Sequence, residues 1–315
     1  MCARVLAIVN GYTGALCLRE IVNQGNEVVG VITSPSFGSD KSPDETVIGV
    51  ATKMLLPLYM PPIEVVKEPS KEFIDLVRCL KPDLIVSMHY PAIFKPAILK
   101  VPSMGCVNIH PSKLPRGRGM TPSFWYLYLG RDTAWTTLHY LDPGVDSGDV
   151  IAYGKIPITD EDTGTTVSRR LSEAAWRIFR DNLPEIISGK AARHEQDLSK
   201  GSYLWAGRDW RLIRWEKKRK GVRGQIRCFT GTGRPAYTYI SGMRLDINDA
   251  QLPSPNEYPE FRENALPGEV IAVVNNGLLV QTGEGQIIVT DYSIEGVGTD
   301  ALFTILQRNV PIVLS

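Results

Sequence analysis

The feature that most limits the possible folds is the alternation of strand-like and helix-like stretches over the first two hundred residues. The strand-like stretches are short and β-branched, whereas the helix-like ones repeat apolar residues at helical spacing. Alternation with short connections predicts an α/β domain, with a Rossmann-like, mostly parallel sheet covered on both faces. The expected strands are 5–10, 27–33, 57–60, 84–87, 105–110, 136–141 and 150–158. The expected helices are 15–24, 46–54, 71–80, one starting near 91, 123–129 and 165–187.

The pattern changes after residue 200. Residues 201–224 are rich in Lys and Arg and are interpreted as a linker, and short strands broken by turns follow from about residue 225. We expect three parts: an α/β domain over 1–200, the linker over 201–224, and a smaller C-terminal β-barrel (OB-like) domain over 225–315. The apolar end Ile312–Leu314 is expected to be buried, against this chain or another subunit.

Bulk composition excludes several classes of protein. The formal net charge is +1, which indicates no general preference for nucleic acid or an anionic membrane. The apolar stretch at the N-terminus is only five residues long, too short for a signal sequence or a membrane span. The five cysteines are scattered, which is typical of reduced thiols in a cytoplasmic protein and indicates no cysteine-based zinc site.

Two polar residues stand at the end of the strand expected over 105–110. Asn108 and His110 are two residues apart, so their side chains leave the same face of the strand. The Pro/Gly/Arg segment that follows cannot continue the strand. The carboxyl end of a strand is where an open α/β sheet places its chemistry.

Asp146 is a third candidate, in the turn-rich segment 141–149 between two expected strands. Aspartates in such loops usually bond to nearby backbone, and Asn108 and His110 could likewise serve structure alone. The combination of these three residues with their flanking loops favours a catalytic role over a structural one.

The motif Asn-x-His-Pro-Ser-x-Leu-Pro-x-x-Arg-Gly at 108–119, followed by a turn containing Asp146, resembles the signature of the folate-dependent formyltransferases. Segments 235–239, 267–271 and 282–285 resemble the small barrel of the branch that includes methionyl-tRNA formyltransferase and the sugar-nucleotide N-formyltransferases. The resemblance covers nearly the whole chain. It implies an enzyme that moves a formyl group from N10-formyltetrahydrofolate to an amine, with no metal required.

The implied chemistry suits these residue types. Asn108 can donate an N–H to the oxyanion formed when an amine attacks the formyl carbon. His110 can take the amine proton or help hold the oxyanion, since either imidazole form is accessible near neutral pH. Asp146 would orient His110 or relay the proton. The other histidines have weaker claims, and His139 is expected to be a core or surface residue of its strand.

The resemblance also implies binding residues. For the folate it implies Met88, Tyr90, Ile93 and Val145, whereas a role for His89 is doubtful because the family often has an aromatic residue there. Gly11-Tyr12-Thr13-Gly14 lacks the GxGxxG pattern, so we expect no dinucleotide site.

The acceptor amine is the open question, with initiator tRNA and a nucleotide-linked amino sugar as the two candidates. The tRNA enzymes carry a basic loop after the second strand, but residues 34–45 here contain one lysine and three acidic residues. Against this, a tRNA binder would use the basic linker, although such charge runs are usually solvated. Its cations are Arg208, Arg211, Arg214, Lys217, Lys218, Arg219, Lys220 and Arg223.

We favour the amino sugar, a small-molecule partner, over nucleic acid. In that interpretation Arg118 reaches a substrate phosphate or holds the loop, Arg116 is a weaker candidate, and Tyr12 lines the acceptor side. A homodimer is possible and a membrane partner is not expected. The alternative of another class is a formyl-folate hydrolase or a folate-binding regulator. A non-enzymatic binder should lack one of Asn108, His110 and Asp146, yet all three are present.

Overall fold

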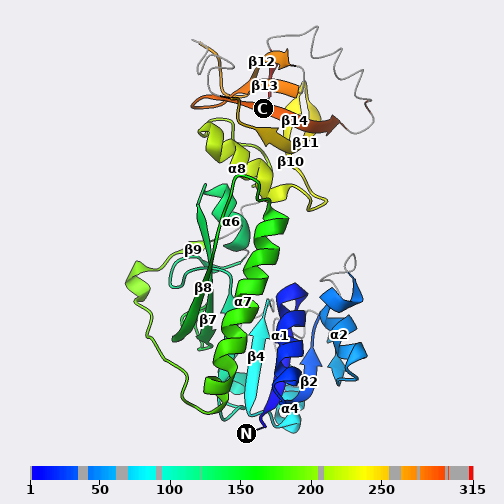
Figure 1. Cartoon of the computed structure of the whole chain (residues 1–315), viewed down its shortest axis with the longest axis vertical. Helices are drawn as coiled ribbons and strands as arrows, with labels where there is room; N and C mark the ends of the chain where they lie inside the picture. The colour runs from blue at the N-terminus through cyan, green and yellow to red at the C-terminus, as the bar shows by residue number, and fades with distance from the viewer. Residues whose placement is uncertain are drawn as a thin grey trace. The chain divides into compact units, whose positions relative to one another are not determined.

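The structure is a computed structural model (Figure 1) that describes residues 2–34, 42–61, 70–89, 94–120, 122–204, 209–254, 264–274, 277–294, 297 and 312–314. It divides into two compact units. The first consists of Met1–Pro122, Ala134–Ile156 and Arg169–Trp205, and the second of Ser123–Thr133, Pro157–Ser168 and Ala206–Ser315. The domain boundaries expected at residues 200 and 224 stay a prediction.

A seven-stranded sheet is the centre of the first unit, in the order β3-β2-β1-β4-β5-β7-β8. Its strands are β1 (Arg4–Val9), β2 (Glu27–Ile32), β3 (Leu58–Tyr59), β4 (Leu84–Met88), β5 (Cys106–His110), β7 (Thr133–Tyr140) and β8 (Val150–Pro157). The pairs from β3 to β5 are parallel, whereas β5 and β7 are antiparallel. The direction of the sheet therefore switches next to β5.

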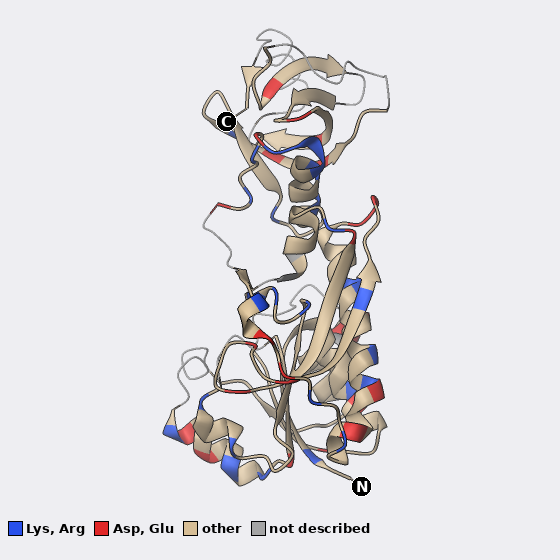
Figure 2. Cartoon of the chain, turned by 90° about the vertical axis from the view of Figure 1, so that its left-hand side faces the viewer, with Lys and Arg blue, Asp and Glu red and all other residues tan. Residues whose placement is uncertain are grey.

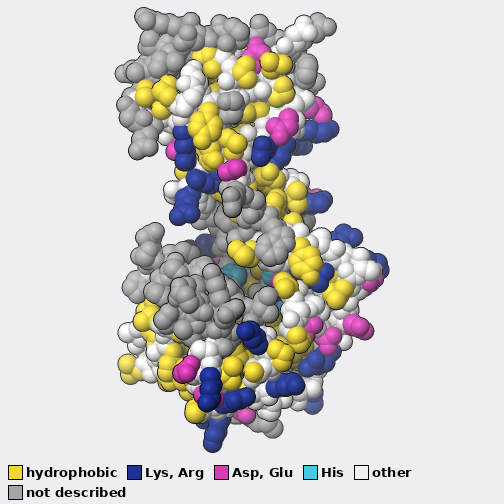
Figure 3. Space-filling model, turned by 180° about the vertical axis from the view of Figure 1, so that it is seen from behind, with side chains coloured by type: hydrophobic (Ala, Val, Ile, Leu, Met, Phe, Trp, Pro, Cys, Tyr) yellow, Lys and Arg dark blue, Asp and Glu magenta, His cyan; other side chains and the backbone are white. Residues whose placement is uncertain are grey.

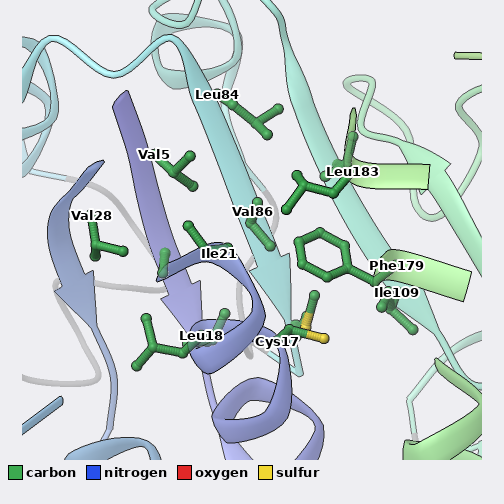
Figure 4. Packing of buried hydrophobic residues seen from close by; sticks show 14 of the residues in the cluster. Val5, Cys17, Leu18, Ile21, Val28, Leu84, Val86, Ile109, Phe179 and Leu183 are labelled. Atoms are coloured by element: carbon green, nitrogen blue, oxygen red, sulfur yellow. The ribbon is translucent and has the colours of Figure 1, made fainter. Parts of the chain in front are cut away.

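Helices cover both faces of this sheet, as the alternation of β1 shows. Val5, Ala7 and Val9 pack in one apolar cluster with α1 and α7 (Figure 4), and Leu6 and Ile8 pack in another with α4 and α5. The helices are α1 (Gly11–Asn23), α2 (Val47–Lys53), α4 (Lys71–Leu80), α5 (Pro96–Leu99) and α7 (Gly164–Ile187), with 3₁₀ turns at Pro43–Glu45 and Leu198–Lys200. Strands buried on both faces explain the nearly continuous apolar runs in the sequence.

Asn10 joins three strand ends at the carboxyl edge of the sheet. Its main-chain N–H donates to the carbonyl of Met88, and its side-chain amide donates to the carbonyl of His89 at 3.2 Å. Its side-chain oxygen accepts from Thr33 and Ser34 after β2. This residue is fully buried, so the edge that holds the candidate site is built around a satisfied amide.

A six-stranded sheet forms most of the second unit, in the order β10-β11-β14-β13-β12-β15 with antiparallel pairing. Its elements are β10 (Ala236–Ile240), β11 (Met243–Gln251), β12 (Glu269–Val274), β13 (Gly277–Gln281), β14 (Gln286–Ile294), β15 (Ile312–Val313), α6 (Pro122–Tyr128) and α8 (Arg219–Phe229). The predicted fold class, a mostly parallel α/β sheet with a smaller C-terminal barrel-like domain, is confirmed.

Residues 209–224, expected to form part of a linker, are packed in the second unit. Trp215 is buried and donates from its indole N–H to Thr238 at 3.0 Å, and α8 begins at Arg219 and buries Val222. Trp215 and Val222 lie among the cations of this segment, and its charge count gives no indication that they are buried. At the C-terminal end, Ile312 and Leu314 are buried, and β15 pairs with β12 of the same chain. Among the described residues, no helix is long and apolar enough to cross a membrane.

Candidate active site

The expected site residues Asn108 and His110 end strand β5, next to the point where the sheet changes direction. Ile109 between them lies in the apolar cluster with α1 and α7, so Asn108 and His110 face the other side of the sheet. The antiparallel register pairs Asn108 with His139 and His110 with Thr137 of β7. All four of these side chains are polar groups that can form hydrogen bonds.

His110 has a partner at each ring nitrogen. Its Nε2 lies 2.8 Å from the carbonyl oxygen of Gly117, which can only accept, so Nε2 carries a proton. Its Nδ1 lies 3.5 Å from Oδ2 of Asp146. His110 is buried, and the structure brings it together with Asp146.

Asp146 lies in the loop between β7 and β8 with φ of +50°, in the left-handed region. Its Oδ2 accepts from the main-chain N–H of Gly119 at 3.1 Å, so the carboxylate also contacts the loop that follows β5. Its side chain is 14% exposed, and Asn108 is also partly exposed. A ligand can therefore reach these two residues, with the histidines behind them. Figure 3 shows histidine side chains in cyan, and of the four histidines His89 and His194 are exposed whereas His110 and His139 are buried.

His139 is a site residue that sequence reasoning assigned to core or surface. Its Nδ1 lies 2.8 Å from the carbonyl of Tyr140 and must donate, which leaves Nε2 to accept from the Asn108 amide at 3.2 Å. Burial lowers the pKa of His139 to about 4, against the opposing effect of Asp146, so the ring is neutral at pH 7. The neutral ring therefore requires the NH₂ group of the Asn108 amide, and not its oxygen, to face it. The only signal for this role is the antiparallel register with Asn108, which local patterns do not reveal.

We call Asn108, His110, His139 and Asp146 the site cluster. It combines an oriented amide donor with a histidine–carboxylate pair, and Oδ1 of Asp146 lies 3.7 Å from Nε2 of His139. Such a set can bind a developing oxyanion and accept a proton from an adjacent nucleophile. Within the described part of the chain, no group of His, Cys, Asp and Glu is arranged to hold a metal ion.

Of the expected folate-binding residues, the structure describes Met88 and Val145. Met88 ends β4, pairs with Ile109 and is fully buried in the same apolar cluster, on the opposite face of the sheet from Asn108 and His110. Val145 precedes Asp146 and is half-buried. Tyr90 and Ile93 lie outside the described residues. His89, also considered, is exposed with φ of +52° beside Gly11.

The expected acceptor-binding residues have different surroundings. Tyr12 lies in the first turn of α1, with the guanidinium of Arg169 5.0 Å from its ring centre. Arg116 is exposed. Arg118, on β6 (Arg118–Gly119), is buried, with its guanidinium 4.3 Å from the ring centre of Tyr203 on the paired strand β9 (Tyr203–Leu204).

The contacts of Arg118 are those expected of a residue that holds the loop. A side chain at Gly201 would approach its guanidinium to 2.7 Å, so Arg118 would have to shift to admit one. Among the described residues, Nε of Arg118 has no hydrogen-bond partner. Its role toward a substrate phosphate stays a prediction.

Comparison with known proteins agrees with this geometry. The formyl transferase family model matches residues 12–183, and the model of the formyl transferase C-terminal domain matches residues 208–299. The chain belongs to the formyl transferase family, and we conclude that it is a folate-dependent formyl-transfer enzyme. Among its relatives, the methionyl-tRNA formyltransferase of Geobacter sulfurreducens is 30% identical over 89% of this chain and 85% of that protein. That of Bacillus subtilis is also 30% identical, over 87% and 84%.

Similar solved structures share the fold. An N-formyltransferase from Helicobacter canadensis, in complex with folinic acid and dTDP-3-aminofucose, gives a TM-score of 0.66 at 18% identity. It covers 92% of this chain and 99% of its own. The sugar 3N-formyltransferase WlaRD gives a TM-score of 0.69 at 18% identity, over 95% of this chain and 100% of its own.

Proposed function

We propose that this enzyme transfers the formyl group of N10-formyltetrahydrofolate to the amine of a small molecule, most simply a nucleotide-linked amino sugar. The observation that carries the reaction is the site cluster, in which an oriented Asn108 amide adjoins a His110–Asp146 pair at a strand end. Family membership supplies the reaction class, and the residues supply groups suited to each step.

The reaction forms one C–N bond and breaks another. The acceptor amine adds to the formyl carbon, the carbonyl oxygen gains negative charge, and the bond to the folate nitrogen then breaks. Asn108 donates to that oxygen through the N–H that does not face His139. The proton lost by the amine goes to the His110–Asp146 pair, where the partly exposed carboxylate is the accessible member, and from there to the departing nitrogen.

The donor is expected to bind beside Met88, Tyr90, Ile93 and Val145. Of the two that the structure describes, Val145 fits this use because it is half-buried beside Asp146. The Met88 side chain is fully buried in the apolar cluster of Ile109, on the other face of the sheet, so it can support only the shape of the strand end. Apolar packing with a few polar groups is how proteins bind ring systems of this kind. The folate supplies the activated formyl group, and these residues bind and orient it.

The acceptor assignment rests on charge. The segment 34–45 carries three acidic residues and one lysine, and its described acids are paired locally. Asp44 contacts Lys53 at 3.1 Å, and Glu45 contacts Arg169 at 2.7 Å. These contacts reduce the negative charge that the two described acids present, so the case against a polyphosphate backbone rests on the charge count of the segment in the sequence. The Helicobacter canadensis protein, whose structure is a complex with dTDP-3-aminofucose, also supports an amino sugar as the acceptor.

The second candidate acceptor is methionyl-tRNA, which the names of the curated relatives favour. The basic segment before and within α8 (Figure 2) is the feature that would serve it. Several of its cations have partners within the second unit: Lys218 contacts Glu284 at 2.6 Å and Arg223 contacts Asp160 at 3.2 Å. Lys217 lies over the ring of Tyr128. These contacts reduce the charge available to a nucleic acid.

A competition assay decides between the acceptors. The enzyme is given N10-formyltetrahydrofolate with nucleotide-linked amino sugars, dTDP-3-aminofucose included, and with charged initiator tRNA, and release of tetrahydrofolate is followed. Formylation of a sugar alone supports the proposal, and formylation of the tRNA overturns the acceptor assignment. Formate release without any acceptor would identify a hydrolase instead. The Asn108→Ala variant provides the background rate.

A further inference from the structure

The loop that carries Asp146 has to reverse direction to reach His110. Because β7 is antiparallel to β5, its end lies beside the start of β5, where the N–H of Leu141 donates to Cys106. Asp146 nevertheless faces His110, four residues further along β5. The loop therefore runs back over roughly 7–13 Å, given the rise of a strand.

Asp146 takes up this position with a backbone conformation that needs support. Its φ of +50° lies in the left-handed region, which costs a residue with a side chain roughly 1 kcal/mol. Within the loop, Oδ1 of Asp142 accepts from the hydroxyl of Ser147 at 2.7 Å and from the N–H of Gly144 at 3.1 Å. These bonds shape the turn but leave the carbonyls of Asp146 and Gly148 to be satisfied elsewhere.

Gln196 supplies the donors from outside the loop. It follows a short bridge in which His194 exchanges hydrogen bonds with Val150 at the start of β8. Its Nε2 donates to the carbonyl of Asp146 at 3.0 Å and to that of Gly148 at 2.6 Å. The residue is 7% exposed, and its Oε1 has no hydrogen-bond partner in the described part of the chain. The opposite amide orientation would place an oxygen against two carbonyls, so only this one holds the loop.

We propose that Gln196 is a positioning residue for formyl transfer, which holds the Asp146 carboxylate opposite Nδ1 of His110. Its effect on turnover passes through Asp146 alone. This inference rests on the proposed function for its kinetic consequence, but the hold on the loop is testable without turnover.

The second unit contains a matched control. Gln225 is also a buried glutamine whose Nε2 donates to two carbonyls, those of Trp210 at 2.8 Å and Leu212 at 2.7 Å. None of the hydrogen bonds that the structure describes for the Gln225 side chain involves the site cluster. Gln196→Ala and Gln225→Ala thus remove the same chemical group from the two units.

The first experiment measures hydrogen exchange of peptides covering residues 142–149. We expect Gln196→Ala to speed exchange there about tenfold, the effect of about 1.4 kcal/mol of lost stabilisation, and Gln225→Ala to leave it unchanged. Equal exchange in wild type and Gln196→Ala would overturn the inference. Because this readout needs no substrate, it stands even if both acceptors fail and the proposed function is wrong.

The second experiment is a double-mutant cycle on turnover with N10-formyltetrahydrofolate and dTDP-3-aminofucose, or initiator methionyl-tRNA if that is the acceptor. Gln196→Ala should lower kcat about tenfold and change the donor KM less than about twofold, yet cause no further loss in an Asp146→Ala background. Gln225→Ala should leave kcat unchanged. Full additivity with Asp146→Ala contradicts the inference. An Asp146→Ala variant as active as wild type contradicts the assigned role of Asp146 instead.

The isosteric variant Gln196→Glu adds a pH readout. An ionised carboxylate would oppose the two carbonyls, whereas the protonated form can still donate one hydrogen bond. Its kcat relative to wild type should therefore rise as the pH is lowered from 8 to 6. A ratio that does not change with pH would mean that the bonds to the carbonyls do not control turnover.

Discussion

The two units each contain a cluster of polar side chains, and the clusters differ in what those side chains contact. In the second unit, Arg227 donates to the carbonyl oxygens of Asp162 and Thr159, and Arg223 donates to the carbonyl of Ala250. Both arginines contact Asp160. We call these residues the arginine cluster. Its donors end mostly on backbone acceptors, which is how folded proteins usually satisfy buried polar groups.

The site cluster is arranged differently. Its members face one another, with separations of 3.5 Å from His110 to Asp146 and 3.7 Å from His139 to Asp146, longer than ordinary hydrogen bonds. Two of its members are partly exposed. Polar side chains that lie close together without forming short hydrogen bonds can still bond to a ligand. The donors of the arginine cluster are already bonded, mostly to backbone carbonyls. The comparison predicts that substitutions in the first affect turnover and those in the second affect stability.

The largest effect is expected at His110. His110→Asn removes the group that exchanges the amine proton, so kcat should fall about 10²–10⁴-fold, while folate binding measured by fluorescence titration stays nearly unchanged. A loss of less than tenfold would contradict the assigned role.

Asn108→Ala should lower kcat about 10²–10³-fold, since it removes the donor to the oxyanion. The matched control is Asn26→Ala. Asn26 is a buried asparagine of the same unit whose side chain bonds only backbone, at Ala3 and Ile21. Single-turnover rates should separate the two variants, and similar rates would place Asn108 with the structural residues.

His139 should make the protein acid-sensitive. Its folded pKa of about 4 is below the ordinary 6.5, so the unfolded chain binds the extra proton as the pH falls through this window. Stability is thus unaffected above pH 6.5 and is lost by up to about 3 kcal/mol toward pH 4. Urea unfolding of wild type and His139→Gln at pH 7 and pH 4.5 measures this. An equal acid loss in both would show that another group is responsible.

Arg227→Met tests the arginine cluster. The carbonyls of Asp162 and Thr159 lose a donor, so the second unit should lose about 2 kcal/mol of stability while kcat at 25 °C stays within about twofold. Thermal unfolding and initial rates provide the two readouts. A selective fall in kcat without a change in Tm would remove the distinction between the clusters.

The smallest effects are expected at exposed cations of the basic segment. Arg214→Ala and Lys220→Ala should each change stability by less than about 0.5 kcal/mol, and formylation of an amino sugar should not change. Lys53→Ala, on the first unit, is the control. A loss of tRNA formylation that is confined to the first two variants, and that becomes smaller at high salt because each lost cation lowers the salt dependence of binding, would favour the competing acceptor.

Sequence reasoning reached the parts of this molecule that local patterns control. Alternation places Asn108 and His110 on one face, and the strand–helix order gives the sheet that carries them. The role of His139 was missed because it depends on the antiparallel register of β5 and β7, which residues far apart in the chain determine together. The burial of Trp215 and Val222 within the predicted linker likewise depends on contacts that a charge count does not show. Gln196 gave no signal at all, because its partners are main-chain carbonyls.

The reversal of the loop after β7 limits how the enzyme can change over evolution or by design. One residue added or removed between Leu141 and Asp146 changes the reach of this segment by up to about 3 Å, enough to separate Asp146 from His110. New acceptor specificities are therefore expected from exchanges at constant length in this loop, and from insertions only outside it.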